Sequence, residues 1–201
     1  PISLLEVYFK VIAKLLANKL GKCVHKNISK SQFGFIPTRT VSEASTYLQT
    51  IINRAKRTGE AIQIVFLDAK AAFDLTRTEA TTAMMKHLGA PDELVKKLNA
   101  LTNKGVFSIE MFGDSSIETE ILSGTGQGDP ASSDKYDATH EGNTLLYKAK
   151  KFNWSLRDGD ELVDPVSFAD DTSIPVQLQS LEDYEELLNF FDSLSAITGY
   201  A

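Results

Sequence analysis

The stretch VDPVSFADDTSIPV, residues 163–176, decides the predicted fold. Two short apolar runs, 163–169 and 172–176, are separated only by Asp170 and Asp171, a spacing that favours two strands joined by a two-residue hairpin turn. Aspartate is common in turns, so the pair alone is consistent with ordinary turn chemistry. The flanking apolar runs indicate more, because carboxylates at the tip of a buried hairpin are costly unless a positive charge neutralises them.

A second buried strand also ends in a carboxylate. The run AIQIVFL, residues 61–67, is apolar and rich in β-branched residues, and it leads directly into Asp68. If Asp68, Asp170 and Asp171 meet, their charges repel one another, and a divalent cation removes that repulsion. Mg²⁺ binds few carboxylates and keeps positions for water and substrate phosphates. Since two such ions serve nucleotidyl transfer, the three aspartates are the candidate metal site.

The rest of the chain alternates predicted helices and strands, without repeats or a low-complexity linker. Residues 106–112 and 117–122 are interpreted as a second hairpin. Apolar residues recur at helical spacing in the ranges 2–20, 41–57, 77–88, 91–103, 131–150 and 180–197. This mixture predicts an α+β fold in which an antiparallel sheet packs on helices.

Composition and charge narrow the function classes. The 201 residues suffice for one large domain or two small lobes. The net charge is -6, yet the first 60 residues hold ten Lys or Arg against three Glu, which suits phosphates; two solvated faces of opposite charge explain this equally well. No apolar run is long enough for a membrane span. The single cysteine, Cys23, excludes an internal disulfide framework and favours an intracellular compartment, either nuclear or cytoplasmic.

Six blocks of sequence resemble the motifs of reverse transcriptases, in that family's order and over nearly the whole chain. FADD (Phe168–Asp171) resembles the catalytic hairpin, with Phe for the usual Tyr, and FLDAKAAFD (Phe66–Asp74) resembles the first catalytic motif. GTGQGDP (Gly124–Pro130) resembles the motif beside the incoming nucleotide. The other blocks resemble non-LTR (LINE-like) retrotransposon polymerases, or their group II intron relatives: residues 1–20, QFGFIPTR at 32–39 and SLSAITGY at 193–200.

The resemblance implies a polymerase palm with a ferredoxin-like core and a mainly helical fingers subdomain, without a thumb. Residues 1–60 would form the fingers and 61–201 the palm, with 76–123 returning in part to the fingers. The implied activity is RNA-directed DNA polymerisation, in which a dNTP is added to a primer 3′-hydroxyl on an RNA or DNA template. The chain is expected to be a domain fragment of a longer polymerase, and its oligomeric state is left open.

The family's motifs assign metal-binding roles to four positions. Asp68 and Asp170 would bind two Mg²⁺ ions, for which Mn²⁺ would substitute. Asp171 would lie close by, and the carbonyl of Ala69 would complete one coordination sphere. These roles are implied by the resemblance and add to the argument from buried carboxylates.

The motifs also imply substrate contacts. These are Phe73 beneath the nucleotide sugar, Gln127 and Gly128 in the nucleotide pocket, Arg39 near the triphosphate, and Lys22 and Lys26 at template phosphates. A core position for the aromatic side chain and solvated positions for the charged ones are open alternatives.

The sequence departs from the family's pattern after Pro130, where an apolar helix is usual. Residues 131–143 read ASSDKYDATHEGN, and these charges predict a weakened core on this side of the helix. His140 has no partner at metal-ligand spacing and is interpreted as a surface or satisfied histidine. The departures sustain a competing hypothesis, an inactive palm-fold module that binds nucleic acid or protein. A nucleotidyl cyclase, which shares a palm-like core, is disfavoured by the FADD hairpin and the Gln-Gly loop.

Overall fold

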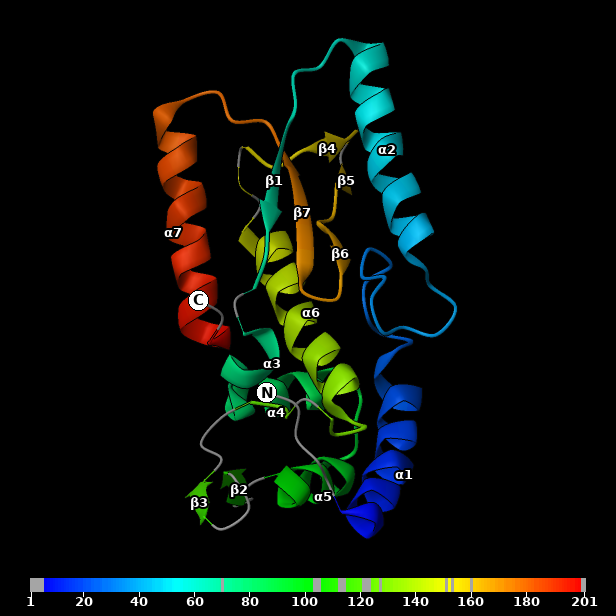
Figure 1. Cartoon of the computed structure of the whole chain (residues 1–201). Coiled ribbons are helices and arrows are strands. Elements are labelled where there is room, and N and C mark those ends of the chain that lie inside the picture. The colour runs from blue at the N-terminus through cyan, green and yellow to red at the C-terminus, as the bar shows by residue number, and fades with distance from the viewer. Residues whose placement is uncertain are drawn as a thin grey trace. The chain divides into compact units, whose positions relative to one another are not determined.

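The structure is a computed structural model that describes residues 6–69, 71–102, 106–111, 115–120, 124–126, 128–150, 152, 154–159 and 161–199. Helices and antiparallel strands are mixed, as the sequence predicts (Figure 1). The chain divides into two compact units, and each unit is built from two separate stretches of chain. Unit 1 comprises residues 1–27 and 71–139, and unit 2 comprises residues 28–70 and 140–201.

Unit 1 is mainly helical. Its first helix, α1 (Val7–Val24), contacts α5 (Asp92–Thr102), which in turn contacts α4 (Thr78–His87). The unit also contains the short α3 (Ala72–Leu75), the hairpin of β2 (Val106–Met111) and β3 (Ser115–Glu120), and the first residues of α6 (Ser132–Lys150).

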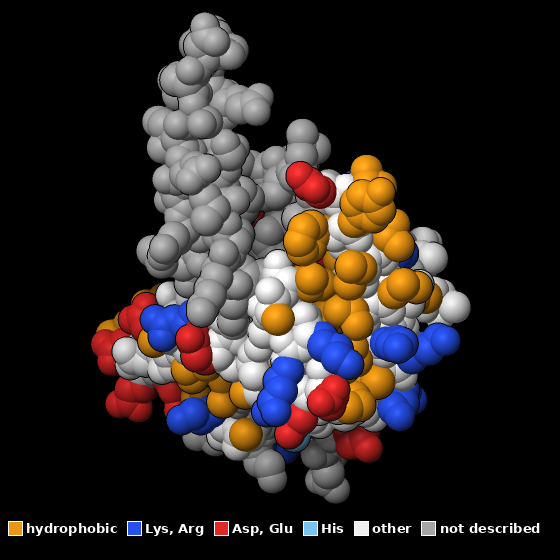
Figure 2. Space-filling view, turned by 90° about the horizontal axis from the view of Figure 1, so that it is seen from below, with side chains coloured by type: hydrophobic (Ala, Val, Ile, Leu, Met, Phe, Trp, Pro, Cys, Tyr) orange, Lys and Arg blue, Asp and Glu red, His pale blue; other side chains and the backbone are white. Residues whose placement is uncertain are grey.

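The two sides of α1 differ in burial. The buried side has small or branched residues at helical spacing, namely Ala13, Ala17, Leu20 and Val24. On the first half of the helix Tyr8, Val11 and Leu15 are 82%, 56% and 59% exposed. Figure 2, which views the molecule from below Figure 1, shows apolar side chains gathered beside Lys and Arg side chains. The described residues therefore leave an apolar side of α1 open.

Unit 2 is built on a three-stranded antiparallel sheet in the order β1–β7–β6. Strand β1 (Gln63–Leu67) pairs with β7 (Asp171–Val176) along its whole length, ending with Leu67 opposite Thr172. Strand β6 (Val166–Phe168) forms the hairpin with β7. This register brings the end of β1 beside the turn of the hairpin.

Helices cover both faces of the sheet in unit 2. On one face, α6 and α7 (Leu181–Thr198) enclose a core whose buried members include Tyr147, Trp154, Ile174, Val176, Leu187 and Phe190. At β6, Val166 packs with residues of α2 (Val41–Thr58), whereas the next residue, Ser167, contacts α6. Successive residues of a strand face opposite ways, so α2 and α6 lie on opposite faces of β6.

Local sequence signals explain where several elements begin and end. Both α2 and α7 start at capping boxes, Thr40 with Glu43 and Ser180 with Asp183. The structure adds α3 and the two-residue strands β4 (Arg157–Asp158) and β5 (Glu161–Leu162), which are too short for periodicity to reveal. Among the described residues, no helix combines the length and apolarity that crossing a membrane requires.

Candidate catalytic site

The β6–β7 hairpin carries two predicted metal ligands, but its turn lies one residue earlier than predicted. Phe168 pairs with Asp171, so the turn residues are Ala169 and Asp170, and Asp171 is the first residue of β7. Ala169 has a φ of 55°, the sign that a primed two-residue turn requires at its first position, at a cost to alanine of about 1 kcal/mol. Composition could not reveal this, because Asp is a better turn residue than Ala.

Asp68, Ala69 and Asp170 line one pocket in unit 2, with a volume of about 170 Å³. Asp68 directly follows β1 and is exposed, and Asp170 is half-buried in the turn. Most of the remaining lining is apolar and comes from the sheet, α6 and α7, with Leu67, Tyr147, Ile174, Phe190, Phe191 and Leu194. Carboxylate oxygens are ligands that Mg²⁺ prefers, so the two aspartates have the chemistry to hold such an ion.

The third aspartate is not part of this lining. Asp171 is exposed at the start of β7 and does not line the pocket. Within the described ranges, no group of three or more His, Cys, Asp or Glu side chains could hold a metal ion. The cluster of three aspartates therefore stays a prediction, and the structure shows a pocket shared by Asp68, Ala69 and Asp170.

Residues 31–34 extend the sheet beyond β6. The backbone N–H of Phe33 donates to the carbonyl of Ser167 at 2.7 Å, and the N–H of Ser167 donates to the carbonyl of Ser31 at 2.9 Å. Gly34 lies against the hairpin tip, where an added Cβ would stand 2.0 Å from the backbone nitrogen of Ala169. No side chain fits there, so the glycine of the QFGF block lets this segment lie directly on the turn.

A buried polar cluster joins α6 to the hairpin. The Nε2 atom of His140 lies 3.0 Å from Ser167 Oγ and 3.4 Å from Thr172 Oγ1, and the two hydroxyls are 3.2 Å apart. Ser167 and Thr172 are paired across β6 and β7. Burial lowers the pKa of His140 to about 4, so its ring is neutral at neutral pH. His140 is thus a buried histidine with hydrogen-bond partners.

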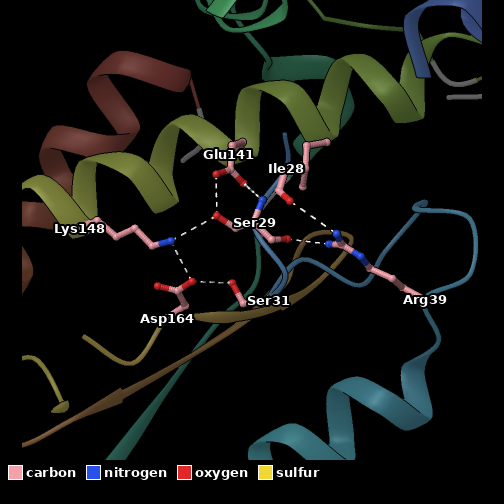
Figure 3. Close-up of polar contacts among 7 residues, drawn as sticks. All are labelled: Ile28, Ser29, Ser31, Arg39, Glu141, Lys148 and Asp164. Carbon is pink, nitrogen blue, oxygen red and sulfur yellow. Dashed lines mark hydrogen bonds and ion pairs between the residues drawn. The ribbon is translucent and has the colours of Figure 1, made fainter. Parts of the chain in front are cut away.

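A second polar network ties the loop after α1 to α6 (Figure 3). Glu141 accepts hydrogen bonds from the backbone N–H and the hydroxyl of Ser29, at 2.9 and 2.6 Å. Lys148 pairs with Asp164 at 2.9 Å, and Asp164 also accepts from the Ser31 hydroxyl at 3.5 Å. Burial raises the pKa of Glu141, and its bonds from Ser29 oppose that shift.

Arg39 is engaged by the same loop. Its Nη1 donates to the carbonyl of Ser29 at 2.6 Å, and its Nη2 donates to that of Ile28 at 3.5 Å (Figure 3). Its Nη1 also donates to the carbonyl of Gln32. A planar guanidinium has several donors in a fixed fork and can hold several carbonyls at once. The contact with a triphosphate stays a prediction, and the structure shows Arg39 holding the loop.

The charged segment after Pro130 is buried, and the predicted weakening of the core by its charges stays a prediction. Lys135, Glu141 and His140 are only 3%, 3% and 6% exposed. Three of the segment's charged groups have partners outside it: Lys135 with Asp129 at 3.2 Å, Asp134 with His25 at 2.6 Å, and Glu141 with Ser29. Charged groups are seldom buried without partners, so this run of charges was itself the signal that partners lie elsewhere in the chain.

In unit 1, Phe73 and the Gly-rich loop lie together. The backbone N–H of Thr125 donates to the carbonyl of Phe73 at 2.8 Å. Gly124, with a φ of 91°, leaves 2.8 Å between an added Cβ and the carbonyl oxygen of Asp74. The half-buried Phe73 ring lies 5.0 Å from that of Tyr136. The structure thus brings together two elements of the predicted nucleotide pocket, while the packing on Tyr136 accords with the alternative of a core aromatic.

No described contact bears on the roles predicted for Gln127, Gly128, Lys22 and Lys26. Gly128 is exposed in the same loop, and Gln127 lies outside the described residues. Lys22, in the last turn of α1, and Lys26, just after it, are both exposed. Their contacts with nucleotide and template stay predictions.

Comparisons with known proteins bear on the family. The reverse transcriptase (RNA-dependent DNA polymerase) family matches residues 1–195. The chain is 22% identical over 197 residues to the transposon TX1 uncharacterized 149 kDa protein of Xenopus laevis, which covers 98% of this chain and 15% of that protein. It is 25% identical over 171 residues to the retrovirus-related Pol polyprotein from the type-2 retrotransposable element R2DM of Drosophila melanogaster. That match covers 85% of this chain and 16% of the Drosophila protein. The chain spans about a sixth of the length of these relatives.

Solved structures share the fold. Telomerase from Candida albicans, in complex with a fragment of telomeric RNA, matches with a TM-score of 0.62 and 14% identity, over 95% of this chain and 34% of that one. Apo telomerase from Candida tropicalis, truncated from its C-terminal domain, matches with a TM-score of 0.55 and 11% identity, over 92% and 36%. The family match confirms what the six blocks indicate: the chain belongs to the reverse transcriptase family and has homologues among the Pol proteins of non-LTR retrotransposons.

Proposed function

We propose that this chain is the fingers-and-palm part of an RNA-directed DNA polymerase that works by two-metal nucleotidyl transfer. The observation that carries the proposal is that Asp68, Ala69 and Asp170 line the same pocket. Membership of the reverse transcriptase family supports the reaction class. Residues 1–60 are assigned to the fingers and 61–201 to the palm, with part of 76–123 returning to the fingers and the thumb outside this chain.

The chain's own contribution to the reaction is placement. Asp68 and Asp170 would hold two Mg²⁺ or Mn²⁺ ions together with the Ala69 carbonyl, while Asp171 stays close as a secondary ligand. When bound, such ions activate the attacking 3′-hydroxyl and neutralise charge on the leaving oxygen. The pairing of β1 with β7 sets the strand end that carries Asp68 beside the hairpin that carries Asp170. Catalysis of this kind depends mainly on such positioning and charge.

The substrates are a dNTP and a primer annealed to an RNA or DNA template. Phe73 is assigned to the sugar, where a ring that packs beneath C2′ excludes a 2′-hydroxyl, and Gln127 and Gly128 to the nucleotide pocket. The hydrogen bond from the Thr125 N–H to the Phe73 carbonyl supports a common place for Phe73 and the Gly-rich loop within unit 1. Arg39 is assigned to the triphosphate side, and the exposed Lys22 and Lys26 to template phosphates.

Metal titration tests the proposal. Binding of Mn²⁺ to the chain, with and without dNTP, is followed by the electron paramagnetic resonance signal of the free ion. We expect saturable binding that Asp68→Asn and Asp170→Asn each weaken at least about tenfold. Asp192→Asn, an exposed carboxylate of α7 outside the pocket, is the matched control and should bind as the wild type does. Equal binding by all four proteins would refute the metal site.

A second candidate is an inactive palm-fold module that binds nucleic acid or protein. The observation in its favour is that the described residues hold no group of three metal-ligating side chains. Primer extension by the longer reading frame that contains this chain separates the two candidates. The polymerase predicts extension that Asp170→Asn abolishes. The module predicts binding of primer–template without extension, and no effect of that substitution on binding.

A further inference from the structure

The cluster of His140, Ser167 and Thr172 lies at the base of the hairpin that presents Asp170. Ser167 and Thr172 form the strand pair immediately before Phe168 and Asp171, the pair that closes the turn. The hydroxyls of both residues contact one imidazole nitrogen of His140 and also each other. The His140 side chain of α6 therefore contacts both strands of the hairpin, at the residue pair next to the one that closes the turn.

Packing alone does not account for a histidine at this position. His140 is 6% exposed and lines the same pocket as Leu67, Tyr147 and Ile174, which pack there without any charge or metal. A buried polar ring costs free energy of desolvation that an apolar residue of similar size would avoid. What the polar ring adds is direction, because hydrogen bonds fix the distance and orientation of their partners and apolar contacts do not.

The orientation of the hairpin has to be fixed at Asp170, because this residue is a proposed metal ligand. Its turn has a residue with a φ of 55° at Ala169, a conformation that persists only when the surroundings hold it. From the other side, backbone pairing with residues 31–33 holds only β6. The His140 cluster is the described contact that holds β6 and β7 to a common third element through side chains. Displacements of about 1 Å in a catalytic group are enough to cost orders of magnitude in rate.

We propose that His140 is a positioning residue, which fixes the Ser167–Thr172 pair and thereby sets where Asp170 stands relative to Asp68. The inference rests on the proposed function, because it assigns His140 to the placement of the metal ligands. The contacts of His140 with Ser167 and Thr172 give it a path to Asp170 through the strands. Partners behind metal ligands of this kind typically contribute about 10–100-fold to metal affinity or activity.

The experiment compares variants of this chain by two independent readouts. His140→Leu removes the hydrogen bonds, Thr172→Val removes one hydroxyl at constant shape, and His140→Gln restores an amide near the place of Nε2. Thr81→Val is the matched control, because Thr81 makes an equally buried 2.8 Å bond to Thr139 of α6, within unit 1. Readouts are the Mn²⁺ dissociation constant, and the backbone amide shifts and hydrogen exchange of residues 168–172 without metal.

The expected result separates positioning from stability. His140→Leu should shift the hairpin amides, speed their exchange and weaken Mn²⁺ binding about tenfold or more, with Thr172→Val intermediate and His140→Gln closer to the wild type. Thr81→Val should lower the melting temperature and change neither readout. If His140→Leu changes the hairpin amides no more than Thr81→Val does, the proposal is overturned.

The metal-free readout keeps the two proposals distinguishable. A wild-type chain that binds no Mn²⁺ overturns the proposed metal site, whereas the amide shifts still decide whether His140 sets the hairpin. In the longer enzyme, His140→Leu should lower kcat and leave KM for dNTP within about twofold, because nucleotide contacts are assigned to other residues. A rise in KM with unchanged kcat would contradict positioning of the metal ligands.

Discussion

Replacing Gly34 by alanine is the sharpest test of how the hairpin is held. A Cβ at this position would lie 2.0 Å from the nitrogen and 2.7 Å from the Cα of Ala169, and 3.0 Å from the carbonyl carbon of Phe168. All three are backbone atoms, so no rotamer change relieves the overlap. To reach an ordinary contact of 3.4 Å, the loop and the turn must separate by about 1.4 Å.

That separation sets the magnitude. The two backbone hydrogen bonds that hold residues 31–33 on β6 are 2.7 and 2.9 Å long, and an opening of this size breaks them. Losing two hydrogen bonds costs about 1 kcal/mol each, and keeping them would strain the backbone by a similar or larger amount. We therefore expect Gly34→Ala to lower the free energy of unfolding by about 2–4 kcal/mol. A shift of this size at the turn also predicts at least about tenfold weaker Mn²⁺ binding, because Asp170 is the next residue after Ala169.

Gly59→Ala is the matched control. Gly59 ends α2 with a φ of 72° and has nothing within 4 Å of an added Cβ, so alanine there meets backbone strain of about 1 kcal/mol and no overlap. Urea denaturation and the Mn²⁺ titration are run on both variants. The reasoning is refuted if Gly34→Ala loses no more stability than Gly59→Ala, or if its metal affinity equals that of the wild type.

Three further predictions concern charge, strain and the loop. The pKa of His140 is about 4 in the folded protein and about 6.5 in the unfolded chain. Below pH 6.5 the unfolded chain therefore takes up a proton that the folded protein does not, and the free energy of unfolding falls. Urea denaturation should show a loss of about 2 kcal/mol between pH 7 and pH 5 that His140→Leu removes; an unchanged slope in the variant would contradict this. Ala169→Gly should raise the melting temperature, by about 0.5–1 kcal/mol of stability, because glycine accepts a φ of 55° without strain; a lower melting temperature would oppose the turn geometry. Arg39→Lys should lower stability by about 1–2 kcal/mol in thermal unfolding, because an ammonium cannot reproduce the fork that holds three carbonyls, and an unchanged melting temperature would argue against that role.

The parts of the fold that the sequence predicts are those with local signals. Short apolar runs indicate β1 and the hairpin, and apolar residues at helical spacing indicate α2 and α7. Asp68 and Asp170 each follow an apolar run and both line one pocket, whereas their role as metal ligands stays a prediction. The family match confirms the family that the motifs indicate, and each motif is also a local pattern.

The parts that were missed depend on contacts between distant residues. The turn register depends on the pairing of Phe168 with Asp171 and on strain at Ala169, neither of which composition encodes. The burial of Glu141 on α6 was not predicted, because its partner Ser29 lies 112 residues away. A pattern along one helix shows that a buried charge needs a partner, and the tertiary structure alone shows which residue supplies it.

The pairing of β1 with β7 has a consequence for synthesis in the cell. Gln63 pairs with Val176 in the sheet, so more than a hundred further residues are synthesised before that partner exists. At about 5–20 residues per second, β1 stays without its neighbour for roughly 6–20 s after it leaves the ribosome. During that time an apolar strand with two open edges is a substrate for chaperones and a nucleus for aggregation. Expression that slows elongation before residue 176 should therefore lower the soluble yield, whereas co-expression of a holdase chaperone should restore it.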